Sequence, residues 1–99
     1  MKLKVTLNHD FTQKELIGEK SVFEVEEGTQ LGELLRIFDK KIIEAGKIKG
    51  IDTTYKTALV NNNLNGCVIF VNGSAPEKML QYELQNGDNF DFVYGFCGG

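Results

Sequence analysis

The sequence has few of the residues that hold metals or cofactors, because its 99 residues include two cysteines, one histidine and no tryptophan. A tetrahedral zinc site takes four ligands, and an iron–sulfur cluster takes four cysteines or equivalent groups. We therefore expect no metal and no permanently bound cofactor. The two cysteines, Cys67 and Cys97, are far apart in the sequence, and in a reducing compartment we expect both to be thiols.

Long apolar runs and a surplus of basic charge are also missing. The longest apolar runs, 67–71 and 90–93, fall far short of the roughly 20 residues that cross a bilayer. The formal net charge is -3 and the basic residues are scattered along the chain, which disfavours nucleic-acid binding. The first residues lack the pattern of a secretory signal. We therefore expect a cytoplasmic protein with neither nucleic-acid nor membrane partners.

Candidate catalytic groups are sparse as well. His9 is expected to be a solvated turn residue without a catalytic role. The carboxylates of Glu24, Glu26 and Glu27 are interpreted as the solvated face and end of a strand. No glycine-rich phosphate-binding motif occurs, so nucleotide binding by this chain alone is not expected. These residue types give no indication that the chain itself catalyses a reaction.

The first part of the chain alternates between apolar and polar residues. This period of two predicts strands over 2–8 and 21–26. The connection between them is too long for a tight turn, so we expect a wide loop in which Phe11 and Leu16 fold back on the core. The two strands are predicted to be antiparallel.

One strong helix follows, beginning near residue 31. Its apolar residues recur at spacings of three and four, which is the helical period. Thr29 is predicted as its N-cap and Gly46 as its left-handed C-cap. The predicted core face consists of Leu31, Leu34, Leu35, Phe38 and Ile42.

The second half of the chain predicts two more strands after an irregular connection. Residues 47–66 show little periodicity and are expected to hold at most a short helical or strand piece. Strands are predicted over 67–71 and 90–94, each next to an Asn-Gly turn signal, at Asn72-Gly73 and Asn86-Gly87. The order of elements predicts one α+β domain over 1–99, a β-grasp with a mixed four- to five-stranded sheet and one main helix on one face.

The sequence ends in Gly98-Gly99, directly after the last predicted strand. Residues 95–99 are therefore expected to form a flexible tail. Glycine has no side chain, so such a tail can enter a narrow channel in extended form with its carboxylate unhindered. These are the properties of a reactive chain end.

The run Val71-Asn72-Gly73, then Leu84, Asn86-Gly87-Asp88 and terminal Gly98-Gly99 resembles the ubiquitin-like sulfur carriers. These include the small subunit of molybdopterin synthase and the thiamine-pathway sulfur carrier. The resemblance implies that a separate ubiquitin-activating-type adenylyltransferase uses ATP to adenylate the Gly99 carboxylate, which is then converted to a thiocarboxylate. It also implies that the chain is a carrier or small non-catalytic subunit and not an enzyme. A further implied partner is a sulfur donor such as a cysteine desulfurase or a rhodanese-like protein.

The same resemblance implies a partner that accepts the sulfur. In molybdopterin synthase this is the large subunit, which supplies the catalytic residues and takes up a tail that corresponds to Gly95, Phe96, Cys97, Gly98 and Gly99 here. Three alternatives stay open: a thiamine-pathway carrier, a ubiquitin-like modifier that forms isopeptides through Gly99, and a plain interaction module.

The roles of the cysteines and of the sheet surface are further hypotheses. Cys97 either reacts during sulfur transfer or fills a tail pocket, and Cys67 is expected in the core. If Phe90 and Phe92 point to the helix, Val93 faces outward by alternation, and Phe70 lies outward beside it. The pair Phe70 and Val93 then forms an exposed apolar partner face.

Overall fold

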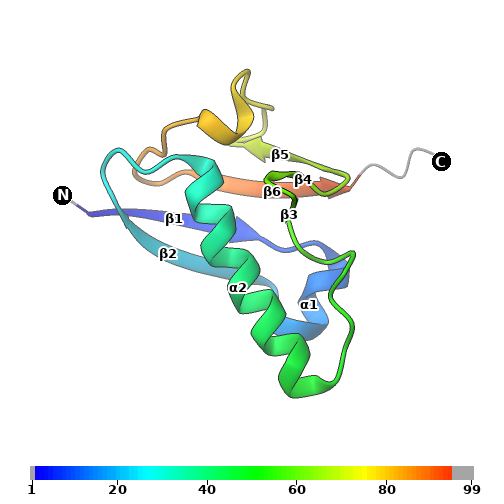
Figure 1. Cartoon of the computed structure of the whole chain (residues 1–99). Coiled ribbons are helices and arrows are strands. Elements are labelled where there is room, and N and C mark those ends of the chain that lie inside the picture. Colours follow the sequence, from blue (N-terminus) through cyan, green and yellow to red (C-terminus); the bar gives the residue numbers. More distant parts are fainter. Residues whose placement is uncertain (1, 95–99) are drawn as a thin grey trace.

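A four-stranded mixed sheet and a long helix across one of its faces form the frame of the molecule (Figure 1). The computed structural model describes residues 2–94. The sheet order is β2-β1-β6-β5, with β1 parallel to β6 and antiparallel pairing elsewhere. The elements are β1 (Lys2–Asn8), α1 (Phe11–Ile17), β2 (Lys20–Glu26), α2 (Leu31–Lys49), β3 (Leu59–Val60), β4 (Asn63–Leu64), β5 (Cys67–Val71), a 3₁₀ turn η1 (Met79–Gln81) and β6 (Asn89–Tyr94).

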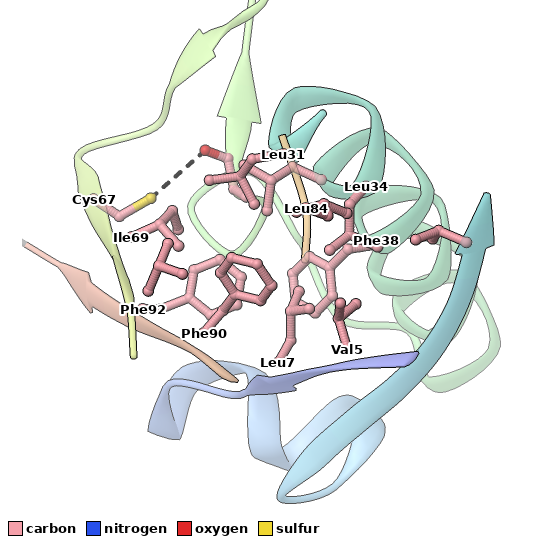
Figure 2. Close-up of a cluster of buried hydrophobic side chains, with 14 of the residues drawn as sticks. Val5, Leu7, Leu31, Leu34, Phe38, Cys67, Ile69, Leu84, Phe90 and Phe92 are labelled. Carbon is pink, nitrogen blue, oxygen red and sulfur yellow. Dashed lines mark hydrogen bonds between the residues drawn. The ribbon is translucent and has the colours of Figure 1, made fainter. Parts of the chain in front are cut away.

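The core lies between α2 and the inner face of the sheet. Figure 2 shows Phe38 of α2 pointing at Val5 and Leu7 of β1, with the ring of Phe92 beside it. The Phe38 and Phe92 rings stack with their centroids 5.0 Å apart. Each such buried side chain contributes roughly 1.5–3 kcal/mol to folding. The α+β architecture with a mixed sheet and one main helix confirms the predicted β-grasp class.

The two ends of α2 differ from the prediction. Gln30, and not Thr29, is the N-cap, and the Glu33 side chain accepts the backbone N–H of Gln30 at 3.0 Å. The helix runs past Gly46 to Lys49, and Gly50 takes the left-handed C-cap conformation with φ 71°.

Gly46 is instead a buried glycine inside α2. A Cβ at this position would collide with Thr53 Cγ2 and lie 2.8 Å from the carbonyl oxygen of Ile51. The absent side chain therefore allows the chain that leaves α2 to pass close against the helix.

The connection between β1 and β2 contains a helix, α1, where a wide loop was predicted. Asp10 is its N-cap, and the Gln13 side chain accepts the backbone N–H of Asp10 at 3.0 Å, so the two form a capping box. Leu16 is buried in the core as predicted, but the prediction for Phe11 is wrong, because that side chain is 71% exposed.

The segment between α2 and β5 forms a two-stranded hairpin, β3–β4, in the region expected to be mostly irregular. Asn61 and Asn62 at its tip have φ values of 51° and 64°, the left-handed pair that a tight hairpin turn needs and that Asn tolerates. The buried carboxylate of Asp39 in α2 holds the segment by accepting the backbone N–H groups of Ala58 (2.6 Å) and Leu59 (3.0 Å). Burial raises the pKa of Asp39.

Among residues 2–94, no helix has both the length and the apolar character that a membrane crossing requires.

Candidate functional site

The last strand, β6, leads directly to the predicted reactive tail. It lies between β1 and β5, and its final residue, Tyr94, is also the last residue that the structure describes. In Figure 1 this end of β6 lies on the same side of the molecule as the β3–β4 hairpin. The predicted tail residues Gly95, Phe96, Cys97, Gly98 and Gly99 lie outside the described residues, so their roles stay predictions.

Tyr94 is held by side-chain and backbone groups from two other segments. Its phenolic oxygen accepts a hydrogen bond from Gln13 Nε2 at 2.8 Å and donates to the carbonyl oxygen of Thr57 at 3.4 Å. Its ring stacks on Phe92, with the centroids 6.3 Å apart. Burial, followed by nearby negative groups, raises the pKa of Tyr94, so the side chain stays a neutral phenol.

Cys67 lies directly across the sheet from Tyr94, at the start of β5. Its side chain is 5% exposed, and its thiol donates a weak hydrogen bond to the carbonyl oxygen of Ala58, with sulfur and oxygen 3.6 Å apart (Figure 2). Burial raises the pKa of this thiol to about 11. The prediction that Cys67 belongs to the core is confirmed, and a protonated, buried thiol is a poor nucleophile.

The outer face of β5 and β6 carries an apolar patch next to this end of the sheet. Val68 and Val93 are paired across the two strands and remain 39% and 44% exposed, and Phe70 is half-buried opposite Asp91. We call Val68, Phe70 and Val93 the outer-face patch. The inward residues are Ile69, Val71, Phe90 and Phe92, all buried. The structure thus brings Phe70 and Val93 together on the outer face, and their contact with a partner stays a prediction.

Charged and polar residues dominate the rest of the outer face. Lys2, Lys4 and Glu24 are exposed there on β1 and β2. Val22 of β2 is the exception, at 52% exposed. Val22 pairs with Thr6 of β1, and Thr6 pairs with Asn89 at the start of β6. Val22 therefore lies one strand away from β6 and four residues before the level of Val93, apart from the outer-face patch.

His9 is buried, so the prediction of a solvated turn residue is wrong. It is 6% exposed, with Nδ1 2.6 Å from the carbonyl oxygen of Gly18 and Nε2 2.8 Å from Ser21 Oγ. Burial is the largest cause of its lowered pKa. A Ser–His pair is a familiar nucleophile and base. Here Ser21 is itself 8% exposed, so the contact ties the end of β1 to β2 and gives no access to a substrate.

The described residues offer little else for chemistry. Across 2–94, no three His, Cys, Asp or Glu side chains gather closely enough to hold a metal ion. The carboxylates of Glu24, Glu26 and Glu27 are exposed, as predicted. The feature that sequence reasoning missed is Gln13, and its one local signal is the spacing of Asp10 and Gln13 in a capping box.

Comparisons with known proteins agree with this geometry. The family model described as the ThiS family matches residues 10–99. No protein with a curated description matches the chain.

Solved structures share the fold at low sequence identity. The Haloferax volcanii HVO 2177 protein superposes with a TM-score of 0.70 at 13% identity, over 99% of this chain and 88% of that one. SAMP1 from Haloferax volcanii gives 0.69 at 14% identity, over 97% and 99%. A putative molybdopterin converting factor, subunit 1, from Pyrococcus furiosus gives 0.62 at 20% identity, over 91% and 94%. With its β-grasp fold and a family match over most of its length, the chain belongs to the ThiS family of ubiquitin-like sulfur carriers.

Proposed function

We propose that this protein carries sulfur as a thiocarboxylate on Gly99 and donates it in molybdopterin biosynthesis. The observation that carries the proposal is the family match over residues 10–99, which includes the Gly98-Gly99 pair. The central position of β6, which leads into the tail from the middle of the sheet, supports it.

The chemistry needs an activating enzyme because a carboxylate is a poor acyl donor. The Gly99 carboxylate attacks the α-phosphorus of ATP, pyrophosphate leaves, and an acyl adenylate forms. The terminal sulfur of a persulfide on a cysteine desulfurase or a rhodanese-like protein then attacks the carbonyl carbon and displaces AMP, which gives an acyl disulfide. A second thiol attacks the donor cysteine sulfur of that acyl disulfide, forms a disulfide with it and releases the thiocarboxylate on Gly99. The partner enzymes provide the ATP site and the catalytic groups, and this chain provides the carboxylate and the docking surface.

The chain's own residues contribute recognition. Gly98 and Gly99 have no side chains, so a narrow channel can admit them. The outer-face patch beside the end of β6 offers apolar area that the activating enzyme covers when the tail enters its site. The same surface then serves the sulfur acceptor, for which we propose the large subunit of molybdopterin synthase. The likeness to a putative molybdopterin converting factor supports that choice of acceptor.

ATP-dependent activation by the adenylyltransferase of the same organism tests the first step. Wild-type protein is expected to release pyrophosphate in proportion to the carrier added. A variant without Gly99, and a variant with one alanine added after Gly99, are expected to release none. The deletion leaves the carboxylate short of the α-phosphate, and the added alanine carries the carboxylate past that position and gives the last residue a side chain. Pyrophosphate release by either variant at the wild-type rate would contradict the proposal.

The acceptor is tested in cells that lack this protein. The proposed pathway is supported if these cells lose molybdopterin and if wild type, but not the variant without Gly99, restores it. If the cells instead require thiamine, the carrier belongs to the thiamine pathway. SAMP1, a small archaeal modifier protein, shares the fold. Isopeptide adducts that depend on Gly99, with both cofactors unaffected, would therefore indicate a modifier.

A further inference from the structure

We propose that Gln13 is a positioning residue that fixes the starting point of the C-terminal tail by holding Tyr94. The inference rests on the proposed function, because it concerns how the Gly99 carboxylate is presented to the activating enzyme. It adds a role for α1 and for the segment after α2, neither of which bears the reacting group.

The Gln13 side chain joins three segments of the chain. It is fully buried, and its Oε1 accepts the backbone N–H of Asp10 at 3.0 Å. Its Nε2 donates to the carbonyl oxygen of Lys56 at 3.0 Å and to the Tyr94 hydroxyl at 2.8 Å. One amide therefore links the start of α1, the segment that precedes β3 and the last residue of β6.

Strand pairing alone holds this end of β6 on one side only. β1 pairs with β6 from Asn89 to Asp91 and then ends, so Phe92 to Tyr94 have no β1 partner. On the other side, the pairing with β5 reaches its last residue pair at Cys67 and Tyr94. Gln13 of α1 supplies a bond to Tyr94 beyond the point where β1 stops. Without that bond, the final residues of β6 are expected to open locally, as strand ends with few contacts do.

When Tyr94 is held in place, the activating enzyme has to order only residues 95–99 as the carrier docks. Residues 95–99 span at most about 18 Å when fully extended, so the Gly99 carboxylate is confined to that distance from Tyr94. If Tyr94 is released, the partner must also order Tyr94 and its neighbours. Ordering about one more residue on docking corresponds to roughly a ten-fold weaker productive encounter. The chemical step at Gly99 is unchanged once the tail is seated.

The test compares Tyr94→Phe with a matched control, Tyr82→Phe. Each change removes one phenolic oxygen, and Tyr82 donates to Asp88 Oδ2 at 2.8 Å, just before the opposite end of β6. The first measurement is amide hydrogen exchange at residues 92–94, which needs no partner. Exchange is expected to accelerate by about ten-fold in Tyr94→Phe and to stay within about two-fold of wild type in Tyr82→Phe.

The second measurement is the steady-state activation of the carrier by its adenylyltransferase. Tyr94→Phe is expected to raise KM by about ten-fold with kcat within about two-fold, whereas Tyr82→Phe leaves both near wild type. Gln13→Met is expected to raise KM similarly. In the double variant with Tyr94→Phe, the KM effects are expected to add only in part, because the Gln13–Tyr94 bond is common to both changes.

The outcomes separate this inference from the proposed function. Unchanged exchange at residues 92–94 in Tyr94→Phe would overturn the positioning role, whether or not the carrier is activated. Equal KM values for the Tyr94→Phe and Tyr82→Phe variants would do the same. Absence of ATP-dependent activation in wild type would refute the proposed function, and the exchange measurement would still decide whether Gln13 holds Tyr94.

Discussion

The outer-face patch gives a direct prediction about partner binding. Replacing Val93 by alanine removes apolar area from the centre of the patch, and replacing Val68 as well removes the residue paired with it across the sheet. Both changes leave the buried residues of β5 and β6 in place. If the activating enzyme covers this surface, its affinity for the carrier falls with each change.

The magnitude follows from how much of each valine remains exposed. Val93 is 44% exposed and Val68 is 39% exposed, so docking can bury only about two-fifths of each side chain. Alanine keeps the Cβ, so each change removes two methyl groups, worth about 1.6 kcal/mol when fully buried and about 0.65 kcal/mol for the part that docking can bury. The expected increase in Kd is about three-fold for Val93→Ala and about nine-fold for the double variant.

Val22→Ala is the matched control. Val22 lies on the same face of the sheet and is 52% exposed, so the same calculation would give it a similar effect if the whole face were covered. Isothermal titration calorimetry with the activating enzyme measures Kd for wild type and for the three variants, and thermal unfolding confirms that each variant is folded. A Kd for the double variant within about two-fold of wild type, or equal to that of Val22→Ala, would refute the reasoning.

Three further predictions concern the described residues. The pKa of His9 is lowered on folding, so the unfolded chain binds more protons below about pH 6.5. The stability difference between wild type and His9→Gln is therefore expected to shrink on acidification by up to about 1.4 kcal/mol per pH unit, in urea titrations. Gly46→Ala is expected to destabilise the protein by about 1–3 kcal/mol, because its Cβ meets Thr53 and Ile51. Cys67, with a pKa of about 11, is expected to react with iodoacetamide at pH 8 at least about 100-fold more slowly in the folded protein than in urea.

Each of these predictions has a clear opposing result. A stability difference for His9→Gln that is constant from pH 7.5 to 5.5 would show that His9 titrates normally. Gly32 in the first turn of α2 is a control for Gly46, because a Cβ there would make a milder contact, 3.2 Å from the carbonyl oxygen of Leu80. A smaller loss of stability is therefore expected for Gly32→Ala than for Gly46→Ala. Equal losses at Gly32 and Gly46 would contradict the close-approach explanation. Rapid labelling of Cys67 at pH 8 in the folded protein would contradict its burial.

The sheet and the main helix are predictable because their patterns are long and regular. Leu3, Val5 and Leu7 alternate along β1, and the apolar residues of α2 recur at helical spacing over several turns. The helix α1 is too short to show a period, and the Asp10 and Gln13 capping pair is its one local signal. The end of α2 was predicted wrongly because a glycine that ends a helix and a glycine that allows a close approach look the same in sequence.

One part of the candidate site is likewise predictable from the sequence, and another part is not. Alternation along β5 and β6 places Val93 and Phe70 on the outer face without any knowledge of the fold. The contact between Gln13 and Tyr94 joins residues 81 positions apart, and nothing in the local sequence of either residue indicates it. The burial of His9 likewise depends on Gly18 and Ser21, which reach it only when β1 and β2 pair.

The mass of the protein purified from its own host tests the central claim most directly. The account predicts a fraction whose C-terminal peptide is heavier by the difference between one sulfur atom and one oxygen atom, with the change located at Gly99 by fragmentation. Fragmentation also separates this change from oxidation of Met79 or Cys97. A Gly99 carboxylate that stays unmodified after incubation with ATP, a sulfur source and the native activating enzyme would contradict the account.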